Sequence, residues 1–174
     1  MIVWLNGTFG VGKTTTATHV LAGFPDARIF DAEEIGYLLR RIGGLPALGD
    51  FQHWPPWRKL VAETARQVLG YVGGTLIIPQ TVLVQSYWAE IREQLTGAGI
   101  EVNLFVLHAD RTTLRQRIER DTEINRAWRL AHIARYESAL PWLRLEGDLV
   151  DTTDMAPEEV AQYVCDHASC SPGA

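Results

Sequence analysis

The stretch Gly7-Thr8-Phe9-Gly10-Val11-Gly12-Lys13-Thr14 directly follows the apolar run Ile2-Val3-Trp4-Leu5. It fits the pattern G-x-x-x-x-G-K-[ST] at every fixed position, in the strand, loop and helix context that the pattern requires. Its glycines let the backbone curl, so that several N–H groups converge on one centre beside the positive end of the next helix. The alternative is a Gly-rich turn that only caps a helix. The stretch predicts a phosphate loop that binds a nucleoside triphosphate.

Two side chains of this loop have specific expected roles. Lys13 is expected to reach the β- and γ-phosphates, and the Thr14 hydroxyl is expected to ligate Mg²⁺. Lysine is scarce in the chain, with Lys59 as the only other one, so its presence in the motif adds weight to the match. ATP and Mg²⁺ are therefore the predicted cofactors, and the predicted nucleotide-binding residues of the loop are Gly7, Phe9, Gly10, Val11, Gly12, Lys13, Thr14 and Thr15.

The composition limits the possible classes of protein. With 174 residues, 47% of them hydrophobic, the chain suits one compact domain with a sizeable core. A net charge of −5 argues against a basic nucleic-acid surface, so no nucleic-acid partner is expected. No transmembrane helix and no signal peptide are predicted, because there is no long apolar run and the amino terminus lacks a basic region. A cytoplasmic protein with Cys165 and Cys170 as reduced thiols is expected.

Apolar segments with strand character alternate with segments of helical periodicity along the chain. This order predicts a three-layer α/β fold, in which a five-stranded parallel sheet carries helices on both faces and binds ligands at the carboxyl ends of its strands. One domain is expected over residues 1–168, with a lid at about 115–128 and a flexible tail at 169–174. Strands are expected at 2–5, 27–30, 75–78, 101–108 and 149–151, and helices at 14–22, 32–42, 57–72, 86–95, 111–120, 128–140 and 157–167.

Asp31 stands at the carboxyl end of the second predicted strand, beside the loop that would hold the γ-phosphate. A carboxylate there could accept a proton from a substrate hydroxyl, or hold a water molecule on Mg²⁺. The alternative is a helix N-cap, with Glu34 completing a capping box. Asp31 is therefore predicted as a catalytic, substrate-binding and water-mediated metal residue that can also act as a cap.

The third predicted strand ends in Pro79-Gln80-Thr81, at a place where many phosphate-loop proteins carry an aspartate that steadies Mg²⁺. The absence of this aspartate argues against a motor-type ATPase. Gln80 and Thr81 are predicted to face a polar substrate, although an ordinary turn between a strand and a helix is an equal alternative.

Arginines cluster around the end of one predicted helix and the polar segment after it: Arg115, Arg117, Arg120 and Arg126. Small phosphotransferases use such a segment as a lid, whose guanidinium groups stabilise charge on the transferring phosphoryl group. Arg117 is the preferred candidate and is predicted to be catalytic, and Arg117 and Arg120 are predicted to contact the nucleotide. The alternative is a solvated face on which Glu119 and Asp121 pair with these arginines.

Two further segments carry candidate binding residues. Phe51, Trp54 and Trp57 place three large aromatic rings within one loop, where they could wall a flat or apolar substrate or could attach the loop to the core. The turn Asp151-Thr152-Thr153-Asp154 is expected near the nucleotide base, and helix capping is its alternative role.

Taken together, these motifs resemble the tunicamycin-resistance ATP-binding proteins, a branch of the nucleotide-kinase-like phosphate-loop family. The similarity covers nearly the whole chain. A more distant similarity is to the chloramphenicol phosphotransferases, which also combine a phosphate loop with an aspartate after the second strand. The residues that carry the main resemblance are Ile2 to Thr14, Phe30 to Arg40, Asp50-Phe51-Gln52 with Trp57-Arg58, and Ile77 to Thr81.

This resemblance implies a cytoplasmic ATP-binding protein that protects a cell from tunicamycin, a nucleoside antibiotic with an acyl chain. The aromatic loop would then stack on the uracil or shelter the acyl chain. Family members have extra residues after the last helix that help membrane attachment. This chain is short there, so peripheral membrane association stays open, and either a monomer or a homodimer is expected.

Three functions remain as alternatives from the sequence. The preferred one is an ATP- and Mg²⁺-dependent phosphotransferase that modifies a hydroxyl of tunicamycin, because lid arginines and Asp31 have little purpose in simple binding. The second is a protein that sequesters the drug and uses ATP only to shape its pocket. The third is a metabolic kinase that acts on a nucleoside or a sugar.

Overall fold

A computed structural model of the protein describes residues 1–122 and 125–169. Residues 123–124 of the expected lid, and residues 170–174 of the expected tail with Cys170, lie outside this part. The strands are β1 (Ile2–Asn6), β2 (Ala27–Ile29), β3 (Thr75–Ile78), β4 (Val102–His108) and β5 (Asp148–Asp151). The helices are α1 (Lys13–Gly23), α2 (Glu33–Ile42), the short 3₁₀ helix η1 (Phe51–His53), α3 (Pro55–Val72), α4 (Gln85–Gly97), α5 (Arg111–Arg120), α6 (Arg126–Glu146) and α7 (Pro157–Ser169).

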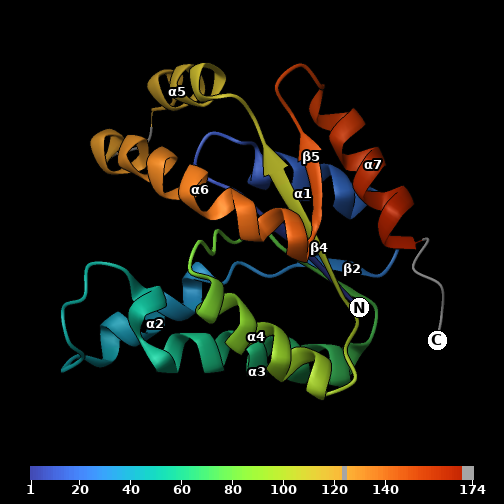
Figure 1. The fold of residues 1–174 in the computed structure, drawn as a ribbon. Coiled ribbons are helices and arrows are strands. Elements are labelled where there is room, and N and C mark those ends of the chain that lie inside the picture. The colour runs from blue at the N-terminus through green and yellow to red at the C-terminus, as the bar shows by residue number, and fades with distance from the viewer. Residues whose placement is uncertain (123–124, 170–174) are drawn as a thin grey trace.

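The five strands form one parallel sheet in the order β2-β3-β1-β4-β5 (Figure 1). β3 and β4 follow one another in the sequence but lie on opposite sides of β1, so the order of the strands changes direction at β1. Sheets of this kind bind ligands at such a switch point. In the register, Trp4 lies opposite Ile78 of β3, and Asn6 lies opposite Val106 of β4. The segments that follow β1, β3 and β4 therefore meet at one edge of the sheet. The predicted α/β fold with a five-stranded parallel sheet is confirmed.

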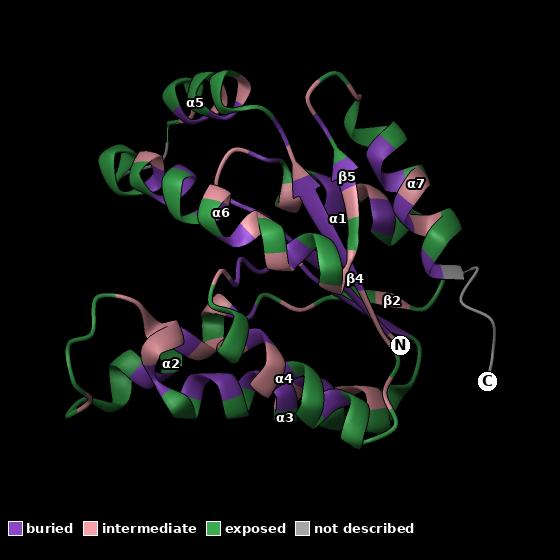
Figure 2. Cartoon of the chain, in the orientation of Figure 1, coloured by how far each residue is buried: buried purple, intermediate pink, exposed green. Residues whose placement is uncertain are grey.

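Helices cover both faces of the sheet (Figure 1). Helices α1 and α7 pack together on one face, and α3, α4 and α6 cover the other. Every residue of β1 and β3 is consequently buried, as expected for a parallel sheet between two helical layers. Most of β4 is buried as well (Figure 2). The Trp4 and Trp88 rings meet edge to face at 5.1 Å between centroids and anchor α4 on the sheet.

Several helices extend beyond the limits expected from the sequence, and at two of them, α3 and α6, the added residues include a proline. The helix expected at 128–140 is longer in the structure, because α6 begins at Arg126 and continues through Pro141 to Glu146, and Leu143 beyond the proline is fully buried. Packing of this last turn on the core outweighs the hydrogen bond that Pro141 cannot donate. At α3 the chain begins its helix at Pro55 rather than at residue 57, because the first turn needs no intrahelical N–H donor.

Candidate nucleotide-binding site

The phosphate loop between β1 and α1 has the curled backbone that its glycines predict. Gly7, Gly10 and Gly12 have φ angles of 136°, 77° and 97°, in the region that side chains with a Cβ rarely adopt. A Cβ on Gly7 would lie 2.6 Å from the carbonyl oxygen of Leu107, at the end of β4. The loop therefore packs closely against its neighbouring strand as well as turning sharply.

A buried asparagine joins this loop to the turn after β3. The Asn6 amide donates to the carbonyl oxygen of Val82 at 2.8 Å, and its side-chain oxygen accepts from the N–H of Val82 at 2.9 Å and of Gly7 at 2.8 Å. Because Asn6 has no exposed surface, all three bonds form in a region of low dielectric, where they are strong and costly to lose. The last residue of β1 thus fixes the start of the loop.

Lys13 lies over the loop and is only partly exposed. Its Nζ donates to the carbonyl oxygens of Gly7 and Thr8, each at 3.0 Å. Loss of hydration lowers the pKa of Lys13 to about 8; the Glu33 carboxylate opposes this shift, and the Arg129 guanidinium adds to it. A phosphate beside Lys13 would replace these weak carbonyl partners with a full negative charge.

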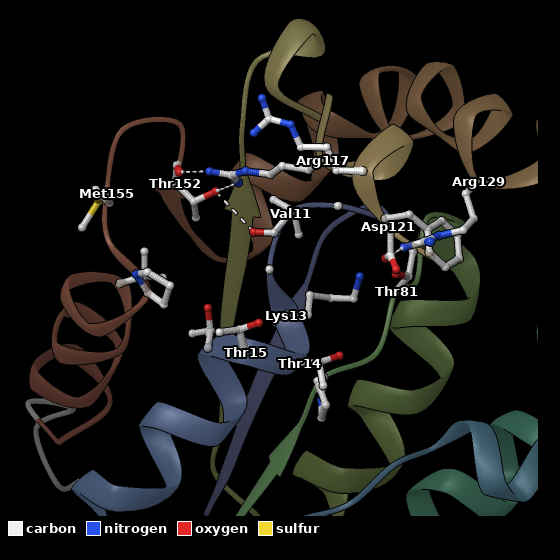
Figure 3. Close-up of a pocket in the computed structure, with 18 of the residues that line it drawn as sticks. Val11, Lys13, Thr14, Thr15, Thr81, Arg117, Asp121, Arg129, Thr152 and Met155 are labelled. Atoms are coloured by element: carbon white, nitrogen blue, oxygen red, sulfur yellow. Dashed lines mark hydrogen bonds and ion pairs between the residues drawn. The ribbon is translucent and has the colours of Figure 1, made fainter. Parts of the chain in front are cut away.

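The loop forms the floor of a cleft of about 860 Å³, which is large enough for a nucleotide and a small second ligand (Figure 3). Thr14 and Thr15, in the first turn of α1, are exposed to it. The other lining residues come from β2, from the turns after β2, β3 and β5, and from α2, α5, α6 and α7: Ile29, Asp31, Glu33, Pro79, Thr81, Arg117, Arg120, Asp121, Arg129, Thr152, Met155, Pro157 and Val160.

Two carboxylates enter this cleft from the segment after β2. Asp31 is exposed, and its Oδ1 accepts from the N–H of Glu33 at 2.9 Å, which orients its side chain at the start of α2. The carboxylate of Glu33 also lines the cleft and acts electrostatically on Lys13. Sequence reasoning selected Asp31 and missed Glu33, although its position two residues later in an acidic first helical turn was a usable signal.

Arg117, the preferred lid arginine, is bonded to the turn after β5 (Figure 3). Its guanidinium donates to the Thr152 hydroxyl at 3.2 Å and to the Thr152 carbonyl oxygen at 2.8 Å. The Thr152 hydroxyl in turn donates to the carbonyl oxygen of Val11 at 3.3 Å. Arg117 therefore connects α5 to the turn that was expected near the nucleotide base. Arg120 also lines the cleft, whereas Arg115 pairs with Glu119 at 3.2 Å and Arg126 is exposed.

A further arginine lines the cleft, and sequence reasoning did not select it. Arg129 of α6 is 7% exposed, and its Nη2 lies 2.8 Å from Oδ2 of Asp121. Its guanidinium also lies over the ring of Phe9, 5.4 Å from the centroid. The selection missed it because it lies inside a helix, just beyond the segment of about 115–128 that was expected to form the lid.

A sequence profile described as an AAA domain matches residues 2–140 of the chain. The chain belongs to this AAA domain family. No curated protein sequence matches it significantly. Among solved structures, it is similar to the Deinococcus radiodurans tunicamycin resistance protein, at 25% identity and a TM-score of 0.77, over 97% of this chain and 95% of that one. This similarity agrees with the family resemblance drawn from the motifs.

Two other solved structures share the fold of the AAA domain. A sugar kinase from Janibacter sp. has 20% identity and a TM-score of 0.70, over 98% of this chain and 95% of that one. The Mycobacterium tuberculosis APS kinase, solved with AMPPNP and APS, has 19% identity and a TM-score of 0.62, over 97% of this chain and 96% of that one. The match to the AAA domain family makes the chain a P-loop protein with a nucleotide-kinase-like fold, and such a domain binds ATP.

The three aromatic residues Phe51, Trp54 and Trp57 are not among those that line the phosphate cleft. Trp57 is fully buried and donates to the Ala32 carbonyl oxygen at 3.0 Å, which fits the packing alternative for this ring. Phe51 packs on Trp57 at 5.1 Å between centroids. Phe51 and Trp54 line a separate cavity of about 310 Å³ with Arg40 and the Gly43–Asp50 segment.

The turn after β3 is tied closely to the phosphate loop. The Thr81 hydroxyl lines the cleft and donates to the Gly7 carbonyl oxygen at 2.6 Å. Gln80 is 2% exposed, and its amide donates to the carbonyl oxygen of Thr81 at 3.1 Å. Gln52 reaches the same carbonyl oxygen at 2.9 Å. Of the two predicted substrate contacts, Thr81 thus lines the cleft, whereas Gln80 is buried and is not among the lining residues.

The described part of the AAA domain holds no group of three or more His, Cys, Asp or Glu side chains set to hold a metal ion. Oxygen donors do line the cleft, namely the Thr14 hydroxyl and the carboxylates of Asp31 and Glu33. Among the described helices, none has both the length and the apolar character needed to cross a membrane.

Proposed function

We propose that this AAA domain transfers the γ-phosphoryl group of ATP to a hydroxyl of a small polar molecule, and that tunicamycin or a related nucleoside antibiotic is the acceptor. The observation that carries the proposal is a single cleft that is lined by Lys13 of the phosphate loop and by Asp31 and Glu33. The Glu33 carboxylate is close enough to Lys13 to act on its pKa. The similarity to the Deinococcus radiodurans tunicamycin resistance protein supports this choice of acceptor.

The carboxylate of Asp31 performs the acid–base step in this proposal. It accepts the proton of the acceptor hydroxyl while the hydroxyl oxygen bonds to the γ-phosphorus, and the bond from that phosphorus to the oxygen bridging to the β-phosphate breaks. The N–H of Glu33 fixes one oxygen of Asp31, which leaves the second oxygen to face the acceptor. The products are ADP and the phosphorylated acceptor.

The charges on the transferring group are balanced by the loop and the arginines. Lys13 and the N–H groups at the start of α1 bind the β- and γ-phosphates. Mg²⁺, when bound, supplies further neutralisation, and Thr14 with the water-bridged carboxylate of Asp31 suits an ion that keeps several of its waters. Arg120 lines the same cleft and adds positive charge to it.

The direct test incubates the protein with γ-labelled ATP, Mg²⁺ and tunicamycin, and follows the label. Label on the drug is expected, and Asp31→Asn is expected to abolish the transfer with ATP affinity largely kept. Asp50→Asn is a matched control, because Asp50 also accepts a backbone N–H two residues on, at 2.9 Å, but does not line the cleft. Normal transfer by Asp31→Asn would leave Asp31 as a helix cap only.

A sequestering protein is the second candidate, and it is favoured by the hydrogen bond from the Glu33 N–H to Asp31, which gives Asp31 a structural role without chemistry. Under this function Asp31 only accepts the N–H at the start of α2, and ATP shapes the pocket for the drug. Stoichiometric, ATP-dependent binding of tunicamycin without labelled product would establish this candidate in place of transfer. A thermal-shift screen of nucleosides and sugars with ATP separates a metabolic kinase from both, because a true ligand raises the apparent stability by mass action.

A further inference from the structure

One aromatic ring lies against two of the cations that line the phosphate cleft, Lys13 and Arg129. Phe9, in the phosphate loop, has Lys13 Nζ at 5.6 Å and the Arg129 guanidinium carbon at 5.4 Å from its ring centroid. The ring also packs on Trp128 and His132 of α6, at 5.0 and 5.3 Å between centroids. Phe9 therefore docks α6 on the loop and sets the place of the Arg129 side chain relative to Lys13.

The charge of Arg129 is balanced by a carboxylate that lies less deeply than the arginine itself. The side chain of Arg129 is 8% exposed and that of its partner Asp121 is 34% exposed. Figure 3 shows the pair on the wall of the cleft, with Lys13 on its floor. The effect of Arg129 on the pKa of Lys13 places the two charges within electrostatic reach of each other. A polyphosphate bound to Lys13 would come within the same reach of Arg129.

We infer that Arg129 binds the terminal phosphate of ATP, and that Asp121 competes with the phosphate for it. In the absence of nucleotide, the ion pair with Asp121 keeps the Arg129 guanidinium over the Phe9 ring and beside the cleft. A triphosphate offers more negative charge than one carboxylate and accepts two parallel hydrogen bonds from a guanidinium. Binding of the nucleotide therefore exchanges the Asp121 carboxylate for a phosphate oxygen on Arg129.

The other cleft arginines fit this role less well. Arg117 donates to the hydroxyl and carbonyl oxygen of Thr152, so it is held at the β5–α7 end of the cleft. Arg120 is exposed on the last turn of α5, where a long side chain must lose more freedom to bind. Arg129 is already ordered by Phe9 and Asp121, which lowers the entropic cost of holding a phosphate.

A double-mutant cycle on ATP binding tests the inference. Calorimetry with Mg²⁺ and ATP would compare the parent protein, Asp121→Asn, Arg129→Gln and the double variant. Asp121→Asn is expected to bind ATP about tenfold more tightly, because the competing carboxylate is removed. Arg129→Gln is expected to bind ATP about tenfold more weakly, and the gain from Asp121→Asn is expected to vanish in the double variant.

Two controls isolate the contact with phosphate. The Arg115–Glu119 pair lies outside the lining of the cleft, so Arg115→Gln and Glu119→Gln should leave ATP affinity unchanged. Inorganic tripolyphosphate should reproduce the coupling between Asp121 and Arg129, and adenosine should show none. Thermal unfolding of each variant confirms that it is folded. If Arg129→Gln does not fold, Arg129→Lys takes its place, because lysine keeps the charge but cannot donate two parallel hydrogen bonds to a phosphate, so ATP affinity should still fall.

A gain from Asp121→Asn that persists in the Arg129→Gln background would overturn the inference, because Asp121 would then act only as a general negative charge. Unchanged ATP affinity in both single variants would do the same. These readouts depend on nucleotide binding and not on transfer. A failure of the proposed phosphotransferase activity is therefore seen separately, in the labelling assay.

Discussion

The hydroxyl of Thr81 and the ammonium of Lys13 share one acceptor, the carbonyl oxygen of Gly7, at 2.6 and 3.0 Å. The turn after β3 therefore determines how strongly the phosphate loop holds its own lysine. Because the Gly7 carbonyl oxygen already accepts a short hydrogen bond from Thr81, its second hydrogen bond, from Lys13, is weaker. This leaves the lysine better able to turn toward a bound phosphate.

Replacement of Thr81 by valine should weaken ATP binding. The variant keeps the shape of the side chain but removes its donor, so Gly7 competes more strongly for Lys13. The dissociation constant for ATP should rise about twofold to tenfold, and the free energy of unfolding should fall by about 1 kcal/mol. Titration calorimetry and urea denaturation measure the two effects. Thr81→Ser should restore ATP affinity, and a serine variant as weak as the valine one would exclude the hydroxyl as the cause.

The affinity for ATP should depend on pH through Lys13. With its pKa lowered to about 8, Lys13 of the free protein loses its proton as the pH rises through this value. A bound phosphate raises this pKa, so the complex holds more protons than its components above pH 8. The dissociation constant should consequently increase above this pH, approaching about tenfold per pH unit, with uptake of up to one proton. Calorimetry in buffers of different ionisation enthalpy measures that uptake.

Two lysine variants provide the control for this dependence. Lys13→Arg keeps its charge throughout this range and should lose the steep slope. Lys59→Arg changes an exposed lysine on α3, which lies outside the cleft, and should keep the slope of the parent. An unaltered slope in Lys13→Arg would assign the titration to another group.

The sequence was sufficient to predict those parts of the structure in which local signals agree with the final fold. The spacing of Gly7, Gly12 and Lys13 determined the phosphate loop, and the short apolar run Thr75–Ile78 was predicted with its observed bounds. The order of elements then determined the sheet. Each of these features depends on neighbours in sequence, such as turn glycines and the period of apolar residues.

The arrangement of the arginines could not be predicted in the same way. Arg129 is 120 residues from Phe9 in sequence, and no local pattern marks the contact between them. Arg117 was chosen from its place on a helix, but its guanidinium is bonded to Thr152 on another element. Helix α6 also continues through Pro141, because its last turn packs on the core. This packing is a tertiary effect, which the helix propensities of the residues do not include.

A methyl group on Gly10 should damage the site. Its φ angle is 77°, and an added Cβ would lie 3.0 Å from Ile118 Cγ1 and 3.1 Å from the Leu114 carbonyl oxygen. Gly10→Ala should lower the free energy of unfolding by about 1 to 3 kcal/mol, through backbone strain and movement of the loop away from α5. ATP affinity should fall as well. Gly70→Ala, in open space on α3, should instead stabilise by about 0.5 to 1 kcal/mol.

Thermal and chemical denaturation compare the two alanine variants. Both add one methyl group to a glycine, so their difference isolates the conformational and steric demands of the loop. Equal stability of the two variants would mean that the loop can relax around Gly10 at no cost.

Asn6 offers a sharp test of how the loop is supported. Its amide donates to the Val82 carbonyl oxygen, and its side-chain oxygen accepts from the N–H groups of Gly7 and Val82, all within a fully buried site. Asn6→Asp keeps the shape but turns the donor into an acceptor that faces a carbonyl oxygen. An ionised side chain would repel that oxygen and lose its hydration, so the free energy of unfolding should fall by about 2 to 4 kcal/mol at pH 7. Because protonation restores a donor and removes the charge, part of the loss should be recovered at pH 5. Urea denaturation of the variant and the parent at both pH values measures this recovery, and a loss that is the same at both would show that packing of the amide, rather than its donor, supports the loop.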